Sequence, residues 1–320
     1  MLSSCKVCNN LQGNKLYEVK EMQLGLHEVF TYQLCGNCGC MQLMNIPADL
    51  SKYYPNREYY SFTSKLAIRP KPDPLRRIRS SWILHGKNKV LGSLLSLGYK
   101  IPDYMQWMKI PQIKFDDKVL DVGTGNGSLL FDLFKNGFTN LTGIDPFIDK
   151  DSNYGVINIF KASIYQLQEE FDYIMLHHVF EHMDEPLKVL LQLNKLLKPD
   201  RYLLLRTPMM GMYGWKTYGT NWVGIDAPRH LIVHSMESIR LLAQKAGFEI
   251  RKTVFDSVAY HLWASEQYKQ GIDLMDKKSY MINKDNSVFS KADIEQFRTI
   301  ARKTNNENQG DQAAFYLYKP

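Results

Sequence analysis

The chain has 320 residues, of which 44% are hydrophobic and 23% charged, and its formal net charge is +7. This composition is typical of a globular protein and argues against the disordered, collagen-like and membrane classes, because no apolar run reaches the roughly 18 residues of a spanning helix. The net charge favours an anionic partner, although solubility explains it equally well. The first residues carry cysteines, lysines and glutamates instead of an apolar signal segment, so we expect a cytoplasmic protein.

All five cysteines lie in two segments near the start of the chain, CKVC and CGNCGC. The pairs Cys5 with Cys8 and Cys35 with Cys38 have the spacing with which four thiolates bind one Zn²⁺ in a reducing compartment. A redox site or disulfides are the alternative, but redox motifs rarely occur as two matched pairs. We therefore expect a structural zinc ribbon over residues 1–48, with KLYEV and HEVFTYQL as its strands and the fifth cysteine as a packed or surface thiol.

Residues 49–113 are predicted to form an aromatic and basic helical connector or lid. From Leu75 onward, the apolar residues have the spacing of an amphipathic helix. An aromatic cluster precedes it, suited either to stacking on a sugar or base or to packing against a larger domain. The cluster comprises Tyr53, Tyr54, Tyr59, Tyr60 and Phe62. The basic residues around the helix either bind phosphate or form a solvated face.

From residue 114 onward, short β-branched runs alternate with helical periods. KVLDVG, LTGID, FDYIMLHH and RYLLLRTP are typical of buried strands, and SLLFDLFKNGF, EPLKVLLQLNKLLK and SMESIRLLAQKAGF are typical of helices. Two more strands, EIRKTVF and AAFYLYK, flank a polar, partly helical insertion at about 264–310. This order predicts an α/β domain over 114–320 with a Rossmann-like, doubly wound, mostly parallel sheet of seven strands.

A glycine-rich turn follows the first strand of this domain, in VLDVGTGNG. Gly123, Gly125 and Gly127 leave the backbone open to a ligand at the carboxyl edge of the sheet. Asp145 ends the next strand, where a carboxylate accepts hydrogen bonds from both hydroxyls of a ribose. A nicotinamide dinucleotide site would share this aspartate but prefers GxGxxG, and here the sixth position is Ser128.

These motifs resemble those of the class I S-adenosylmethionine-dependent methyltransferases, over about residues 114–256 and loosely over the last strand. The resemblance implies that Asp121 and the glycine turn surround the methionyl part of S-adenosylmethionine, while Asp145 holds the ribose. FKASIYQL corresponds to a third-strand motif in which Ser163 replaces the usual Asp, and Ile164 is expected to pack on the adenine ring. The residues expected to bind the cofactor are Asp121, Gly123, Thr124, Gly125, Asn126, Gly127, Asp145, Pro146, Ser163, Ile164 and His177.

Three further segments, HVFEHMDEP, NWVGIDAPRHL and AGFEI, are together similar to a bacterial subgroup of these enzymes found in glycan and secondary-metabolite pathways. Sugar C-methyltransferases also join a two-CxxC segment to such a domain, but they carry another C-terminal domain that this chain is too short to contain. The resemblance implies a small, sugar- or glycan-related hydroxylated acceptor, with O-methylation favoured and C-methylation as the alternative.

The candidate catalytic residues are histidines that follow the predicted fourth and fifth strands. A sugar hydroxyl holds its proton at neutral pH, so a positioned base contributes roughly 10²–10⁴-fold. His178, His182 and His230 are the candidates, with Arg229 as an anion anchor; loop-stabilising hydrogen bonds are the alternative role. His178, Glu181 and His182 also spell HxxEH, which in metalloproteases lies within a helix. Here a strand precedes the motif and a helix starts after it, so we expect it in the turn between them, on the rim of the pocket.

Two other functions stay open. A zinc-ribbon RNA methyltransferase is the alternative enzyme, although an Asn/Asp-Pro-Pro-aromatic motif for exocyclic base amines is absent, and RNA binding would need a phosphate-tracking surface. A zinc-ribbon binding protein with a non-catalytic, cofactor-sensing domain is the alternative of another class. Asp121, the glycine turn and Asp145 argue against it because they are all intact. We expect a small-molecule or glycan-related partner in preference to nucleic acid, and no membrane span.

Overall fold

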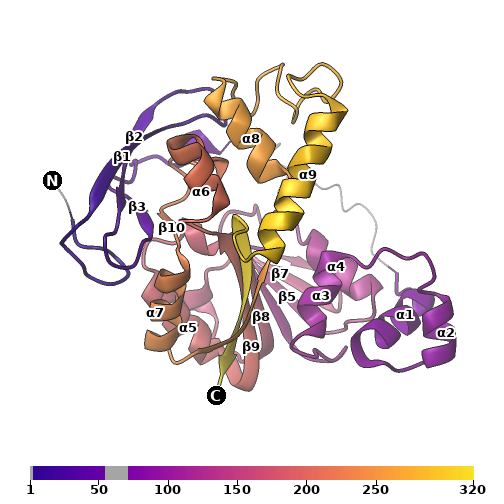
Figure 1. The fold of residues 1–320 in the computed structure, drawn as a ribbon. Coiled ribbons are helices and arrows are strands. Elements are labelled where there is room, and N and C mark those ends of the chain that lie inside the picture. Colours follow the sequence, from indigo (N-terminus) through magenta and orange to yellow (C-terminus); the bar gives the residue numbers. More distant parts are fainter. Residues whose placement is uncertain (1–2, 55–70) are drawn as a thin grey trace.

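Two β-sheets and the helices around them form the described part of this computed structural model, residues 3–54 and 71–320 (Figure 1). The smaller sheet is antiparallel throughout and has the order β1-β2-β3-β10. Its strands are β1 Lys15–Lys20, β2 Val29–Leu34, β3 Met41–Leu43 and β10 Ile232–Val233. The first two match the predicted ribbon strands. The fourth comes from the C-terminal part of the chain, so the ribbon sheet is completed by a segment that we had assigned to the α/β domain.

The larger sheet has eight strands among the described residues, in the order β11-β12-β9-β8-β4-β5-β7-β6. The strands are β4 Val119–Val122, β5 Leu141–Ile144, β6 Ser152–Asn153, β7 Ile157–Phe160, β8 Phe171–His177, β9 Leu197–Pro208, β11 Glu249–Phe255 and β12 Gln312–Lys319. The five central strands pair in parallel, as expected of a Rossmann-like fold. The predicted number of seven is wrong by one, because the two-residue β6 adds an antiparallel edge beside β7.

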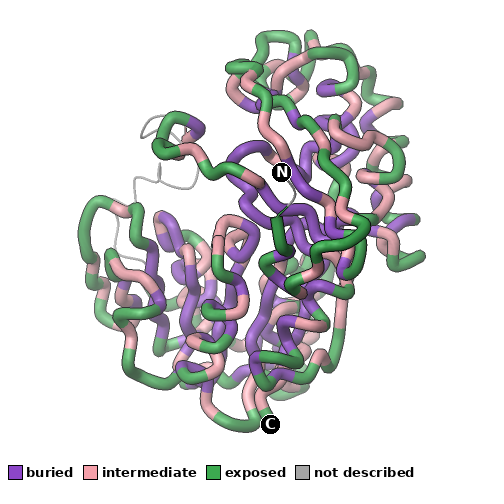
Figure 2. Tube along the Cα trace, turned by 90° about the vertical axis from the view of Figure 1, so that its left-hand side faces the viewer, coloured by how far each residue is buried: buried purple, intermediate pink, exposed green. Residues whose placement is uncertain are grey.

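Helices cover both faces of the large sheet, and this explains why its central strands are apolar runs without alternation (Figure 2). In β8, Ile174 and Leu176 belong to the core cluster shared with α5 and α7, whereas Tyr173 and Met175 belong to the cluster shared with α3 and α4. The helices of the two layers are α5 Pro186–Leu196 and α7 Met236–Lys245 on one side, and α1 Pro74–His85, α3 Asp103–Lys109 and α4 Ser128–Lys135 on the other.

Local sequence signals set several helix ends. Asp73 caps α1 by accepting a hydrogen bond from the amide of Arg76 at 3.0 Å, and the helix stops at Gly86, whose φ is +67°. Ser235 caps α7 in the same way. The predicted helix over 185–198 ends earlier, at Leu196, because β9 starts at once with Leu197.

The connector contributes packing helices to the described structure. Its helices are α1, α2 Lys89–Leu94 and α3. Ile83 and Leu84 of α1 and Met105 and Met108 of α3 are buried in the cluster that faces β4 and α4. Of the predicted aromatic cluster, Tyr59, Tyr60 and Phe62 lie outside the described residues.

Two further helices, α8 Tyr260–Lys269 and α9 Lys291–Asn306, lie beyond the carboxyl edge of the large sheet, at the top of Figure 1. They make up the helical part of the predicted insertion. The short helix α6 Tyr213–Tyr218 packs against α8. None of the described helices is long and apolar enough to cross a membrane.

Candidate functional site

A cavity of about 960 Å³ opens at the carboxyl edge of the parallel strands. One side is bordered by the glycine turn after β4, the end of β5 and the loop after β7. The opposite side is bordered by the turn after β8, by the segment around Asp226 and His230, and by α8 with the loop that follows it. Because a ligand that enters this space meets the ends of several strands at once, the cavity is the candidate active site.

The glycine turn brings bare backbone to the cavity. Gly123, Gly125 and Gly127 all have positive φ, at +73°, +52° and +76°. A Cβ atom on Gly123 would lie 2.3 Å from Val179, and one on Gly127 would lie 2.3 Å from Ile159. Side chains are therefore excluded at both positions by the backbone conformation and by the neighbouring residues.

Asp145 is held in place by the turn that it faces. Its Oδ2 accepts a hydrogen bond from the amide of Gly125 at 3.1 Å, and its Oδ1 accepts one from the amide of Phe147 at 2.8 Å. Burial raises the pKa of this carboxyl, although the two amides lower it. Each oxygen retains a lone pair, so the residue can accept both hydroxyls of a ribose at the cavity surface.

The other residues predicted to bind the cofactor fall into two sets. Gly123, Gly125, Asp145, Pro146, Ser163, Ile164 and His177 border the cavity. Thr124, Asn126 and Gly127 shape the turn behind it, and Asn126 accepts a hydrogen bond from the amide of Ser128 at 2.9 Å. Asp121 is buried under the turn, and this burial raises its pKa to about 7, with the charge of Asp145 acting in the same direction and Thr124 against it.

The loop after β7 supplies the apolar side of the cofactor half. Ser163 begins a 3₁₀ turn, where its amide donates to Oε1 of Gln166 at 2.8 Å. This capping box places Ile164, which is 3% exposed, against the cavity. An apolar side chain beside a carboxylate that can accept two hydroxyl groups suits an adenosine, so the residues present on this side fit S-adenosylmethionine.

His177 closes the floor between the two halves. Its ring packs at a tilt against that of Trp107 of α3 with 4.1 Å between the centroids, and neither ring nitrogen has a hydrogen-bond partner among the described residues. Burial, with Arg206 and His178 nearby, lowers the pKa of His177 well below its usual value, so the ring is neutral. Sequence reasoning missed Trp107, because α3 lies outside the predicted α/β domain.

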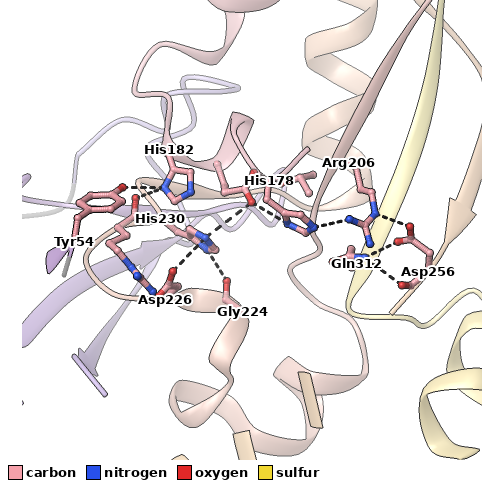
Figure 3. Close-up of polar contacts among 12 residues, drawn as sticks. Tyr54, His178, His182, Arg206, Gly224, Asp226, His230, Asp256 and Gln312 are labelled. Atoms are coloured by element: carbon pink, nitrogen blue, oxygen red, sulfur yellow. Dashed lines mark hydrogen bonds and ion pairs between the residues drawn. The ribbon is translucent and has the colours of Figure 1, made fainter. Parts of the chain in front are cut away.

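The acceptor half begins at His178, which has left-handed backbone with φ +54°. Its Nε2 lies 2.9 Å from Nη1 of Arg206 (Figure 3). Arginine only donates, so Nε2 is the accepting nitrogen and Nδ1 carries the proton, 3.4 Å from Oε1 of Glu181. Arg206 in turn donates to Asp256 at 2.6 Å. The histidine is thus oriented from both sides.

Glu181 is the most buried member of the HxxEH segment, with no exposed surface. Its Oε2 accepts a hydrogen bond from the hydroxyl of Thr207 at 3.0 Å, whereas Oε1 accepts no well-formed hydrogen bond from the part of the chain that the structure describes. Burial opposes the charge, but His178, His230 and His182 together hold the pKa of this carboxyl at about 2. The segment lies in the turn between β8 and α5, with Phe180–His182 in 3₁₀ conformation, as predicted from the sequence.

His182 and His230 pack against each other edge to face beside this carboxylate, with 4.8 Å between their ring centroids. Nδ1 of His182 lies 2.8 Å from the carbonyl oxygen of Arg229, and Nδ1 of His230 lies 2.9 Å from that of Gly224. Carbonyls only accept, so both Nδ1 atoms carry a proton, and Nε2 is the nitrogen of each ring that faces away from these carbonyls. Burial, with the charge of His230, lowers the pKa of His182 to about 4.

Arg229, predicted to anchor an anion, forms an ion pair with Asp226 and is 3% exposed. Asp226 also lies 3.5 Å from Nε2 of His230. The acceptor half therefore combines three imidazoles with two carboxylates around one end of the cavity. The link between Asp226 and Glu181 through His230 could not be read from the sequence, because it depends on how two distant segments meet.

The cysteines of the ribbon form a second cluster. One sulfur from each of Cys5, Cys8, Cys35 and Cys38 lies within 4.8 Å of the others. The Cys5–Cys38 and Cys8–Cys35 sulfurs are 3.6 and 3.5 Å apart. A tetrahedron with Zn–S bonds of about 2.3 Å needs S–S distances of about 3.8 Å, so the four thiols fit zinc. Cys40 packs against the same cluster, with its sulfur 3.5 Å from that of Cys5.

Comparison with known proteins identifies the family. A family model described as a methyltransferase domain matches residues 85–253, more than half of the chain. The mouse EEF1A lysine methyltransferase 2 is 54% identical over 41 residues, which is 13% of this chain and 17% of that protein. The tRNA U34 carboxymethyltransferase of Campylobacter curvus is 26% identical over 151 residues, which is 43% of this chain and 51% of that one. The chain thus spans about half, or less, of the length of these curated relatives.

The cyclopropane synthase MmaA2 from Mycobacterium tuberculosis is similar in structure, with a TM-score of 0.40 and 18% identity over 64% of this chain and 78% of that one. The fold, the glycine turn with Asp145 and the match over residues 85–253 agree with one another. The chain therefore belongs to the methyltransferase-domain family.

Proposed function

We propose that this methyltransferase transfers a methyl group to the oxygen of a small hydroxylated acceptor, with sugar- or glycan-related molecules as the first candidates. The observation that carries the proposal is the acceptor half of the cavity, where His178, His182 and His230 surround the carboxylate of Glu181. This wall offers both donors and acceptors of hydrogen bonds to hydroxyl groups. α8 and the loop after it border the same space, which favours an acceptor that enters the cavity whole.

The cofactor half is assigned to S-adenosylmethionine. Asp145 would hold the ribose hydroxyls, the glycine turn would lie against the methionyl part, and Ile164 would pack on the adenine. When bound, the cofactor supplies an electrophilic methyl group on a sulfonium, so the protein has to align the acceptor and exclude water.

The acceptor hydroxyl needs a group that withdraws its proton. Nε2 of His182 is one candidate: Nδ1 donates to the carbonyl of Arg229, and burial lowers the pKa of the ring to about 4, so the ring is neutral. Nε2 of His230, whose Nδ1 donates to the carbonyl of Gly224, is the other candidate. His178 has both ring nitrogens engaged, with Arg206 and with Glu181, so we assign it a positioning role. This division refines the sequence-based proposal that all three are catalytic.

A macromolecular acceptor is the second candidate. The relatives described above are named for tRNA and for a protein lysine, and no described feature of the cavity is specific to a sugar. RNA binding would need basic side chains that can contact phosphates, and three arginines of α1 already have partners within the protein. Arg76 pairs with Asp73, Arg77 lies over the ring of Phe115, and Arg79 lies 3.5 Å from the ring centroid of Tyr99.

The proposal also covers the zinc ribbon, while the domain boundaries and the location stay predictions from the sequence. We propose that Cys5, Cys8, Cys35 and Cys38 bind one structural Zn²⁺. The division into a ribbon over 1–48, a connector over 49–113 and a methyltransferase domain over 114–320 stays a prediction, as does the cytoplasmic location.

The test is transfer of labelled methyl groups from S-adenosylmethionine to a panel of nucleotide sugars and glycosylated aglycones, to bulk tRNA and to a protein extract, each at two salt concentrations. Label on a small hydroxylated acceptor, unchanged by salt, supports the first candidate. Label on tRNA that falls steeply with salt supports RNA instead, because phosphate contacts are salt-dependent. Label on protein alone, or on no acceptor, overturns the hydroxyl proposal.

A further inference from the structure

We propose that Glu181, His182 and His230 bind a divalent transition-metal ion in the acceptor half of the cavity. One ligand atom from each residue lies within 4.8 Å of the other two (Figure 3). Two imidazoles and one carboxylate form a ligand set that binds Zn²⁺ in catalytic sites and Fe²⁺ in oxygenases, and that leaves coordination positions open. The site is separate from the ribbon, whose ligands are thiols only.

The two histidines make the backbone hydrogen bonds that orient imidazole ligands of a metal. A metal-binding imidazole almost always donates its other N–H to a carbonyl, a carboxylate or water, because this fixes the tautomer and the ring orientation. Nδ1 of His182 does so to the carbonyl of Arg229 at 2.8 Å, and Nδ1 of His230 does so to the carbonyl of Gly224 at 2.9 Å. Nε2 is left as the ligand atom in both rings.

Glu181 supplies the independent observation that points to a bound cation. Its side chain is completely buried, and its Oε1 accepts no well-formed hydrogen bond although Oε2 is satisfied by Thr207. Among the described residues, Nδ1 of His178 lies 3.4 Å from Oε1, and Nε2 of His230 lies 3.9 Å from it. A buried carboxylate oxygen that has only this poorly formed contact with His178 is costly, and direct coordination of an ion removes the cost.

The surroundings favour a cation further and show where its open positions lie. Asp226 adds a carboxylate 3.5 Å from Nε2 of His230, although its other oxygen is paired with Arg229, so we do not count it as a ligand. His182 and His230 both border the cavity, so the remaining positions of the ion face the space for an acceptor oxygen. This last step rests on the proposed function: with the ion in place, His182 and His230 are ligands instead of bases.

A cobalt titration of the whole protein tests the site. Co²⁺ bound by thiolates has an intense near-ultraviolet charge-transfer band, whereas Co²⁺ bound by imidazole and carboxylate has only weak visible bands, so one titration separates the ribbon from the proposed site. We expect wild type to bind one Co²⁺ without the thiolate band. Glu181→Gln, His182→Gln and His230→Gln should each weaken that ion at least about 10-fold, and His27→Ala, which removes an exposed histidine, should not.

Two further measurements keep the outcomes distinct. Binding of S-adenosylmethionine by each variant, measured by calorimetry, should stay within about 2-fold of wild type and shows that the variant is folded. Absence of the imidazole-type Co²⁺ from wild type, or its undiminished binding to the three variants, overturns the metal site while leaving the proposed function standing. Conversely, the metal site survives if the ion binds as expected and no hydroxylated acceptor is methylated.

Discussion

Asp145 is the residue on which the proposed binding of the cofactor depends most. It is 6% exposed, and its two oxygens are already oriented by the amides of Gly125 and Phe147. That orientation is present without a ligand, so the proposed ribose hydroxyls would meet an acceptor that needs no rearrangement.

Replacing this residue should weaken the cofactor. Asp145→Ala is expected to cost about 1–3 kcal/mol of S-adenosylmethionine binding, because the hydrogen bonds to the ribose are lost. Isothermal titration calorimetry measures the change, and Asp149→Ala, which alters an exposed aspartate of the same loop, serves as the control. Equal affinities for Asp145→Ala and wild type would disprove the assignment.

A second prediction at the residue scale concerns pH. Burial raises the pKa of Asp311 from 3.8 to about 7, against the hydrogen bond that its carboxylate accepts from the amide of Gly214. When folding raises the pKa of a carboxyl group, the contribution of that group to the free energy of unfolding is fully present below the unfolded pKa. The contribution is lost as the pH rises through the folded pKa. Stability should therefore fall between about pH 4 and pH 7 on account of this group.

Asp311→Asn isolates this effect because the amide keeps an acceptor for Gly214 but does not titrate. Relative to wild type, the variant should gain about 2–3 kcal/mol in free energy of unfolding between pH 5 and pH 8, since each pKa unit corresponds to about 1.4 kcal/mol. Urea unfolding of both proteins at the two pH values provides the comparison. A difference between them that does not change with pH would refute the assigned pKa.

At the residue scale, the sequence was informative where a function is local. The glycine turn and Asp145 could be predicted because a strand, a turn and a carboxylate occur within one short stretch. The role of Glu181 could not, because its environment is created by Thr207 and His230 from other parts of the chain. Trp107, which packs against His177, carries no motif at all.

Among the elements, the ribbon sheet is the one whose stability depends on chemistry beyond hydrogen bonds. Its three N-terminal strands are short, and β3 has only three residues. Cys5, Cys35 and Cys38 are buried in the same core cluster as residues of α5 and α7, so the cysteine cluster lies against the main domain.

Replacing the proposed zinc ligands should therefore lower the stability of the main domain as well as that of the ribbon. Elemental analysis should find zinc in the wild-type ribbon, and Cys5→Ser or Cys38→Ser should lose it together with several kcal/mol of stability, on the order expected of a structural site. Cys40→Ser, at a buried neighbour of the cluster, should keep the zinc. A folded Cys5→Ser protein with full thermal stability would contradict a structural role.

Elements were predictable in proportion to their length and periodicity. The parallel strands and the helices α4, α5 and α7 have clear apolar patterns, and they occur where expected. The two-residue strands β6 and β10 have no period that could be detected, and they are defined by the partners that they meet. The start of β9 was missed because it follows α5 without a loop.

Several distant parts of the chain border the same cavity. They are the large sheet, the turn after β8, α8 and Gln23 from the segment after β1. A ligand there contacts parts of the chain that are far apart in sequence. Binding should then stabilise the protein as a single unit, because the bound state exists only when all of these parts are assembled.

We expect S-adenosylmethionine at 100 times its dissociation constant to raise the free energy of unfolding by about 2.7 kcal/mol. In a thermal melt this should raise a single transition by several degrees. The same concentration should have a smaller effect on Asp145→Ala. Two separate transitions, with only one shifted by the ligand, would show that the parts unfold independently.

The pairing of β3 with β10 limits how this enzyme can be recombined. Gln42 lies opposite Ile232, and Met41 lies opposite Val233, while the amide of Leu43 donates to the carbonyl of Leu231 at 2.9 Å. The strand that accepts the ribbon follows His230 by two residues. A ribbon grafted from another protein would have to reproduce this register. A graft out of register would displace β10 and, with it, His230 at the border of the cavity. In a chimera, substrate preference should therefore follow the matched pair of β3 and β10 and not either half of the chain alone.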